Sequence, residues 1–290
     1  MPRILRHLRH PLAATDLVYR RLTAGYHQRR TRRDVESLRR DRVDRCFCGG
    51  ELRSFAWHQS YGVCADCGSY VNRRPPAVDE LAHLYSLEFY WHGRVRTKGQ
   101  PPIERRPALD RSDGRVERWL ALIERHAPSA QRVLEVGCGS GVLLAELKAR
   151  GRECLGVEPD EQTAAWTQAQ TGVEVRAGLF PMDGLPEVDL FLAFDVLEHA
   201  RDPVAFMAGA AHVLRPGGVA IIQTPVDRYP GLEPPFGKGA RHVFDDVEHC
   251  FLFTDDGLRR LATAAGLIVR DLSEALWAQH EICVLEKPIS

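Results

Sequence analysis

A glycine-rich turn lies in the middle of the chain, between a strand-like run and a helix-like run. The apolar segment 133–136 leads into Gly137, Gly139 and Gly141, and a helical pattern begins at Val142. A strand, a tight glycine turn and a helix in this order form the corner at which doubly wound α/β sheets hold phosphates or nucleotides. Glycine is needed there because the backbone turns sharply and approaches its ligand without a Cβ atom in between. The pattern predicts a nucleotide-like ligand, and a turn without any ligand is the alternative.

The spacing of the glycines separates one cofactor from another. The dinucleotide fingerprint Gly-x-Gly-x-x-Gly would require glycine at position 142, where the chain has valine. A second predicted strand ends in Glu158, where a carboxylate can receive two ribose hydroxyls. In these residues the sequence resembles the S-adenosylmethionine (SAM)-dependent methyltransferases of the Rossmann-like class, whose glycine loop and acidic strand end hold SAM. The resemblance implies that the following residues bind the cofactor: Glu135, Gly137, Gly139, Gly141, Glu158 and Asp195.

A second polar cluster, Asp195, Glu198 and His199, follows the apolar run 188–194. In the family that the sequence resembles, this stretch lines the reactive methyl group and the substrate, so Glu198 and His199 are catalytic candidates. Histidine titrates near neutral pH, which suits a base that removes a substrate proton. The alternative is that Glu198 and His199 only cap the turn. Some ubiquinone-pathway O-methyltransferases use an acidic-x-x-Glu-His stretch for a divalent cation, so the resemblance also offers a Mg²⁺ site here.

The segment 225–250 is rich in proline and glycine, and we expect it to cover the pocket as a lid. His249 is the second candidate base, with a packed, purely structural histidine as the alternative. Lys238 or Arg241 could hold a phosphate or carboxylate of the substrate, although surface charges of this kind usually only contact solvent.

Four of the eight cysteines form two pairs, each followed by glycine and separated by 15 intervening residues. This spacing is typical of a zinc ribbon, in which four thiolates around a structural Zn²⁺ replace a core that so short a segment cannot build. The first pair is Cys-x-Cys where Cys-x-x-Cys is usual, and a disulfide is the alternative. The predicted ligands are Cys46, Cys48, Cys64 and Cys67.

The sequence that follows the cysteines extends the family resemblance. The stretches 64–76, 79–85 and 88–91 are similar to a methyltransferase subgroup that joins a four-cysteine ribbon to the catalytic domain. Its members commonly act in sugar, polysaccharide and natural-product biosynthesis. The resemblance therefore implies a small-molecule acceptor, methylated on oxygen or carbon.

The elements around these residues alternate between strands and helices, which predicts an open α/β sheet with its ligand at the carboxyl edge. The family resemblance makes this a Rossmann-like sheet of seven mostly parallel strands, the last one antiparallel. Asp202 and Thr254 are expected to begin helices, and 215–218 to end one before a strand at 219–223. The expected parts are a basic helical arm over 1–44, the ribbon over 45–75, a partly helical linker over 76–112, and the methyltransferase domain over 113–290.

Composition is ordinary for a globular protein, with 44% hydrophobic and 27% charged residues and a net charge of zero. Without an apolar signal core or a membrane-length run, we expect a cytoplasmic protein with free thiols. Residues 1–45 hold thirteen arginines against five acidic residues, a net charge of +8. This arm could contact a membrane surface, nucleic acid or a partner subunit, or fold onto its own domain. An RNA-modifying methyltransferase and a non-catalytic binding subunit are the competing functions, and the ribbon lacks the basic and aromatic stripe that RNA binding favours.

Overall fold

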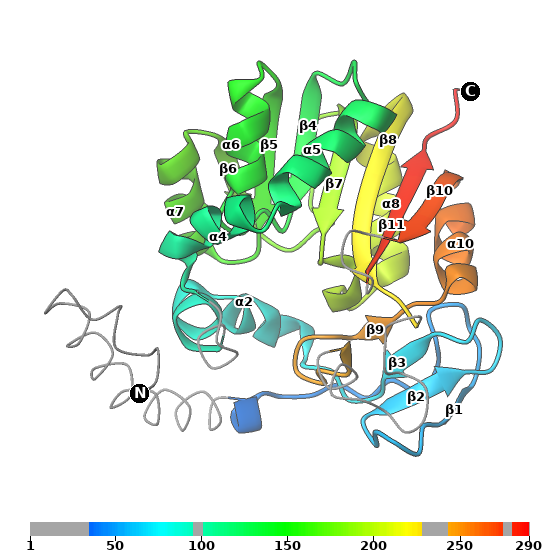
Figure 1. The fold of residues 1–290 in the computed structure, drawn as a ribbon. Coiled ribbons are helices and arrows are strands. Elements are labelled where there is room, and N and C mark those ends of the chain that lie inside the picture. Colours follow the sequence, from blue (N-terminus) through cyan, green and yellow to red (C-terminus); the bar gives the residue numbers. More distant parts are fainter. Residues whose placement is uncertain (1–34, 95–100, 228–242, 275–279, 290) are drawn as a thin grey trace, which may run out of the picture.

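A computed structural model of the chain describes residues 35–94, 101–227, 243–274 and 280–289. These residues contain an open, seven-stranded α/β sheet with the strand order β10-β11-β8-β7-β4-β5-β6 (Figure 1). The strands are β4 (Arg132–Val136), β5 (Glu153–Glu158), β6 (Glu174–Ala177), β7 (Val188–Phe194), β8 (Leu214–Pro225), β10 (Ile268–Glu274) and β11 (His280–Glu286). Neighbours from β6 to β8 are parallel, whereas β11 is antiparallel to both β8 and β10. The predicted fold class is confirmed.

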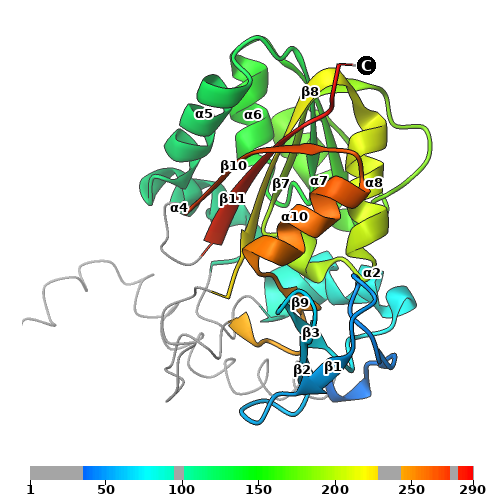
Figure 2. The same cartoon turned by 90° about the vertical axis from the view of Figure 1, so that its right-hand side faces the viewer.

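Helices cover both faces of the sheet, as the apolar central strands require. The helices are α5 (Arg115–His126), α6 (Val142–Ala149), α7 (Glu161–Thr171), α8 (Pro203–Val213) and α10 (Asp255–Ala264). Figure 2 shows α5 and α6 on one face and α8 and α10 on the other. Strand β7 is buried almost along its whole length because both layers pack against it.

The starts of three helices are fixed by side-chain caps. Asp160 accepts a hydrogen bond from the amide of Thr163 and Asp202 one from the amide of Ala205, while Thr254 caps α10. The starts predicted at Asp202 and Thr254 are therefore confirmed.

The start of β8 differs from the expectation. We expected a helix-ending turn over 215–218, but β8 already begins at Leu214. Leu214 pairs with Val188 of the neighbouring strand, and the amide of Gly217 donates to the carbonyl of Lys287 at 2.8 Å. Contacts with both neighbouring strands thus keep residues 215–218 in the strand despite their proline and glycines. The local sequence does not contain these long-range contacts, so it could not predict the start of β8.

The ribbon is a second sheet below the carboxyl edge of the first (Figure 1). It contains β1 (Leu52–Ser54), β2 (Tyr61–Cys64), β3 (Tyr70–Asn72) and β9 (Phe251–Leu252), all antiparallel in this order. The expected ribbon over 45–75 supplies only the first three strands. Its fourth strand comes from the distant segment after the predicted lid, so the two sheets are joined through the chain at β9.

A linker with short helical turns connects the ribbon to α5 and lies at the carboxyl edge. Its elements are η2 (Val78–Glu80), α2 (Leu81–Leu84), the π-helix η3 (Leu87–Arg94), η4 (Ile103–Arg105) and α4 (Arg106–Ser112). Most of the basic arm, and Lys238 and Arg241 of the expected lid, lie outside the described residues. Among the helices of the described ranges, none combines the length and apolar character that a membrane span needs.

Candidate active site

The glycine loop between β4 and α6 has the backbone that its sequence predicts. Gly137, Gly139 and Gly141 have φ values of 68°, 50° and 68°, in the left-handed region that disfavours side chains. A Cβ on Gly137 would stand 2.5 Å from Cγ2 of Val196, and one on Gly141 would stand 2.5 Å from Cγ2 of Thr167. Glycine at these positions is therefore required by space as well as by conformation.

Two carboxylates flank the loop at the ends of β4 and β5. Glu158 accepts a hydrogen bond from the amide of Gly139 at 2.9 Å. Glu135 has a buried oxygen, Oε2, that finds no hydrogen-bond partner among the described residues. Burial, together with the charge of Glu158, raises the pKa of Glu135 to about 8. Burial also raises the pKa of Glu158 to about 7, against the lowering effect of the Gly139 amide. A buried acceptor of this kind suits a ligand that carries donor groups.

These features fit SAM in the way the sequence predicts. The ammonium group of SAM is a cationic donor that suits an unpaired buried carboxylate, and the ribose hydroxyls are donors that suit Glu158. The glycine loop presents no side chains at Gly137 and Gly139 to such a ligand. Glu135, Glu158, Gly137 and Gly139 line a cavity of about 710 Å³ at the carboxyl edge of the sheet.

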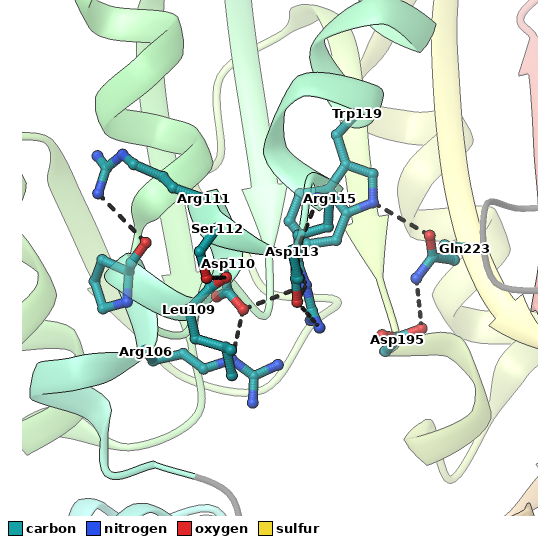
Figure 3. Close-up of polar contacts among 11 residues, drawn as sticks. Arg106, Leu109, Asp110, Arg111, Ser112, Asp113, Arg115, Trp119, Asp195 and Gln223 are labelled. Carbon is teal, nitrogen blue, oxygen red and sulfur yellow. Dashed lines mark hydrogen bonds and ion pairs between the residues drawn. The ribbon is translucent and has the colours of Figure 1, made fainter. Parts of the chain in front are cut away.

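A polar network anchors Asp195, the first residue after β7 (Figure 3). Trp119 donates from Nε1 to the side chain of Gln223 at 3.2 Å, and Gln223 donates from Nε2 to Asp195 at 2.9 Å. Asp195 has a φ of 57°, a conformation that is uncommon for a residue with a side chain. A strained and hydrogen-bonded residue at a cavity wall is typical of functional sites.

Two arginines and two aspartates of α4, α5 and the turn between these helices lie beside Asp195 (Figure 3). Asp110 is buried and accepts from Arg106 at 2.8 Å, while its distance to Nε of Arg115 is 3.3 Å. Arg115 also forms an ion pair with Asp113 at 2.7 Å. Arg106, Asp110 and Arg115 border the cavity, and because the two arginines pair with the two aspartates the group is charged but balanced. The sequence analysis missed this feature.

The two candidate bases, His199 and His249, lie side by side on the other wall, with ring centroids 5.0 Å apart. The Nδ1 atom of His199 is 2.8 Å from the carbonyl oxygen of Glu248, and the Nδ1 atom of His249 is 2.7 Å from that of Val243. A carbonyl only accepts, so each Nδ1 carries a proton, and in the neutral ring each Nε2 then keeps its lone pair. Both imidazoles are therefore set to take a proton or to bind a metal at Nε2.

Glu198 completes this group but is almost fully buried, with 1% of its surface exposed. Its Oε2 accepts from the hydroxyl of Thr224 at 2.9 Å, and its Oε1 lies 3.8 Å from Nε2 of His199. Burial and the charge of Asp195 raise the pKa of Glu198 well above its usual range. One ligand atom from each of Glu198, His199 and His249 lies within 4.8 Å of the others. The resemblance implied a cation site of Asp195, Glu198 and His199. In the structure the residues that could share a cation are Glu198, His199 and His249.

The four predicted cysteine ligands also meet. Their sulfur atoms lie within 4.8 Å of one another, and the pairs Cys46–Cys67 and Cys48–Cys64 are 3.7 and 3.4 Å apart. Tetrahedral Zn–S bonds of 2.3 Å place sulfurs about 3.8 Å apart, whereas a disulfide needs about 2.05 Å. The amides of Asp66 and Cys67 approach Sγ of Cys64 at 3.4 and 3.5 Å, as the glycine-containing turn leads us to expect. The geometry fits zinc and does not fit disulfides.

Two aromatic residues of the linker border the cavity without having been singled out as site residues. Tyr85 lies against His199, with ring centroids 5.6 Å apart, and donates to the carbonyl of Glu248 at 3.5 Å. Trp91 lies over the glycine loop. Both belong to stretches that the sequence analysis used only for the family resemblance, and nothing in their spacing showed that they face the loop.

The chain matches known methyltransferases. Residues 109–272 match a family model described as a methyltransferase domain. The ubiquinone biosynthesis O-methyltransferase of Aeromonas salmonicida is 29% identical over 161 residues, covering 51% of this chain and 67% of that protein. A probable S-adenosylmethionine-dependent methyltransferase of Mycolicibacterium smegmatis is 35% identical over 115 residues, covering 38% of this chain and 45% of that protein. The chain therefore spans less than half of the second relative.

Solved structures share the fold at low sequence identity. Magnesium protoporphyrin IX methyltransferase of Synechocystis PCC 6803, with bound S-adenosylhomocysteine, superposes with a TM-score of 0.54 at 16% identity, covering 71% of this chain and 96% of that one. An S-adenosylmethionine-dependent methyltransferase from Mesorhizobium loti gives a TM-score of 0.50 at 17% identity, covering 60% of this chain and 99% of that one.

Proposed function

The chain belongs to the SAM-dependent methyltransferase family, and on that premise we propose that it methylates a small molecule through a proton-accepting histidine pair. The observation that carries the proposal is the arrangement of one cavity. The glycine loop, Glu135 and Glu158 form one wall, and His199 and His249 form the other. A volume of about 710 Å³ is in the range of sites for small molecules.

The cofactor brings an electrophilic methyl group on a sulfonium, so the protein has to align an acceptor and exclude water. In our proposal Glu135 faces the ammonium group and Glu158 the ribose hydroxyls. On the opposite wall, Nε2 of His199 or His249 removes the proton of an acceptor hydroxyl or acidic C–H group. The carbonyl oxygens of Glu248 and Val243 hold the Nδ1 protons, which stabilises each ring in the basic tautomer and in its protonated form.

The acceptor class follows from the chemistry that needs a base. Hydroxyl groups and carbon acids must lose a proton on methylation, and both occur in sugars, glycan precursors and natural-product intermediates. Relatives named as ubiquinone biosynthesis O-methyltransferases favour oxygen as the acceptor atom. A structural Zn²⁺ held by Cys46, Cys48, Cys64 and Cys67 is part of the same proposal.

A cation-assisted reaction is the second candidate, favoured by the meeting of Glu198, His199 and His249. A divalent ion there would lower the pKa of an acceptor hydroxyl and would compensate the buried carboxylate. Two imidazole nitrogens and one carboxylate are a donor set typical of transition metals, because Mg²⁺ prefers oxygen ligands. The donors therefore favour Zn²⁺, Mn²⁺ or Fe²⁺ over the Mg²⁺ that the resemblance implied.

An acceptor screen tests the proposal. Purified protein is incubated with SAM and with sugars, nucleotide sugars and phenols, and release of S-adenosylhomocysteine is followed. For an accepted substrate we expect His199→Ala or His249→Ala to lower turnover by about 10²–10⁴-fold, the contribution typical of general-base catalysis. Affinity for S-adenosylhomocysteine, measured by calorimetry, should stay unchanged in both variants. His212→Ala, an exposed histidine on α8, is the matched control.

The outcomes separate the two mechanisms. Turnover that survives dialysis against a chelator, with zinc retained in the ribbon, supports the base. Turnover that is lost on dialysis and restored by Mn²⁺ supports the cation. Unchanged turnover in both histidine variants would remove both from the mechanism, and an S-adenosylhomocysteine affinity that cannot be measured would refute the proposed enzyme.

A further inference from the structure

Trp91 sits where the linker crosses the cofactor loop. A Cβ atom built on Gly139 would stand 3.1 Å from Cζ2 and 3.4 Å from Cη2 of the Trp91 ring. The indole is 9% exposed and borders the same cavity as Glu135 and Glu158. The linker therefore covers the glycine loop with an aromatic side chain.

The indole N–H of Trp91 is buried and, in the part of the chain that the structure describes, has no hydrogen-bond partner. Cζ2 is only two bonds from Nε1 in the indole ring, so the edge that carries the N–H is the edge that approaches the loop. A buried donor without an acceptor destabilises the fold, and native proteins rarely leave one unsatisfied. The contrast with Trp119 is direct, because its N–H has Gln223 as an acceptor.

The position of Trp91 is fixed from both sides. The amide of Leu87, at the start of η3, donates to Asp160 at 3.0 Å, and Asp160 is also the cap of α7. The indole packs in an apolar cluster with Ile103 and Trp166. These contacts hold the ring against the glycine loop. The N–H is therefore held at a fixed position beside the cavity.

We propose that the indole N–H of Trp91 donates a hydrogen bond to an oxygen of the bound cofactor. Trp91 thereby becomes a cofactor-binding residue supplied by the linker outside the sheet. Glu135 with its unpaired acceptor and Trp91 with its unpaired donor together match a ligand that carries both kinds of group, as an amino acid joined to a ribose does. This inference rests on the proposed function, since it assumes that the cavity binds SAM.

The test uses S-adenosylhomocysteine and 5′-methylthioadenosine, measured by calorimetry on the full chain. Trp91→Phe keeps an aromatic cover over Gly139 but removes the N–H. We expect it to weaken S-adenosylhomocysteine binding about tenfold, the loss typical of one hydrogen bond. Trp166→Phe, which changes the same aromatic cluster away from the cavity, is the matched control and should bind as the wild type does.

The second ligand lacks the carboxylate and the ammonium group but keeps the ribose. A loss on S-adenosylhomocysteine alone supports the inference with the acceptor on the amino-acid part, and an equal loss on both ligands supports it with the acceptor on the ribose. Unchanged binding of both ligands by a folded Trp91→Phe variant overturns the inference and leaves the proposed function standing. A wild-type chain that binds neither ligand overturns the proposed function itself.

Discussion

Replacing Gly137 with alanine perturbs the glycine loop in two separable ways. The residue has a φ of 68°, so any side chain is strained there. The new Cβ would also stand 2.5 Å from Cγ2 of Val196, closer than real Cβ atoms come. The loop or Val196 must therefore move, and both line the cavity.

The two costs can be worked out from the geometry. Left-handed backbone costs an alanine roughly 1–2 kcal/mol. An added methyl group that overpacks a tight site costs about 1–3 kcal/mol more. We therefore expect Gly137→Ala to lower the free energy of unfolding by about 2–5 kcal/mol.

A control and a rescue separate these costs. Gly151 has a φ of 81°, but no described residue lies within 4 Å of a Cβ built on it, so Gly151→Ala carries the backbone strain alone. In the double variant Gly137→Ala/Val196→Ala the clashing methyl groups are gone, so the overpacking should disappear. Urea unfolding of the variants gives the free energies, and calorimetry gives the affinity for S-adenosylhomocysteine. We expect Gly137→Ala to lose affinity, Gly151→Ala to keep it, and the double variant to recover part of the stability.

Two results would refute this reasoning. Equal destabilisation by Gly137→Ala and Gly151→Ala would show that the contact with Val196 costs nothing. Additive effects of the two single substitutions in the double variant would show that the two side chains do not compete for space.

Three further predictions concern the charge of the site, the zinc and the junction of the two sheets. Because the folded-state pKa of Glu135 is about 8 against 4.5 ordinarily, the folded chain keeps a proton that the unfolded chain loses. The free energy of unfolding of the ligand-free protein should then fall as pH rises from about 5 to about 8. In Glu135→Gln, the free energy of unfolding, measured by urea at each pH, should depend less on pH. Removing zinc with a chelator under reducing conditions should abolish hydrogen-exchange protection in β1–β3 and in β9 while affinity for S-adenosylhomocysteine changes little; protection that persists in β9 would contradict this. Thr254→Val should cost about 1–2 kcal/mol through the lost cap of α10, and more than Asp202→Ala, because the Thr254 hydroxyl also donates to the carbonyl of Cys67 at 2.5 Å.

The cofactor half of the site could be predicted from the sequence because its parts are local. A glycine turn, an apolar strand and an acidic strand end leave their mark within some 25 residues. The backbone angles at Gly137, Gly139 and Gly141, and the bond from Gly139 to Glu158, agree with that prediction. Their roles in binding the cofactor remain proposals.

The spatial arrangement of His199 and His249 could not be predicted from the sequence. His199 and His249 were both singled out, but no local pattern brings them to within 5.0 Å of each other. Their neighbourhood depends on long-range contacts, such as the bond from the amide of Cys250 to the carbonyl of Glu198 at 2.7 Å. Trp91 was missed for the same reason, because its proposed role depends on the contact between the linker and the glycine loop.

Because strand β9 comes late in the chain, the ribbon sheet cannot be completed until most of the protein has been synthesised. The four cysteines leave the ribosome early, but their sheet lacks its last strand until residues 251–252 follow. Tyr61 and Asn72 of the ribbon then donate to the carbonyl of His249, at 2.8 and 3.2 Å. The ribbon is therefore not a transferable module: cutting the chain between 75 and 76 would remove the supports of His249 and leave Phe251 and Leu252 without their sheet. A nascent chain therefore positions His249 and completes the ribbon sheet in the same late step, and neither arrangement forms without the other.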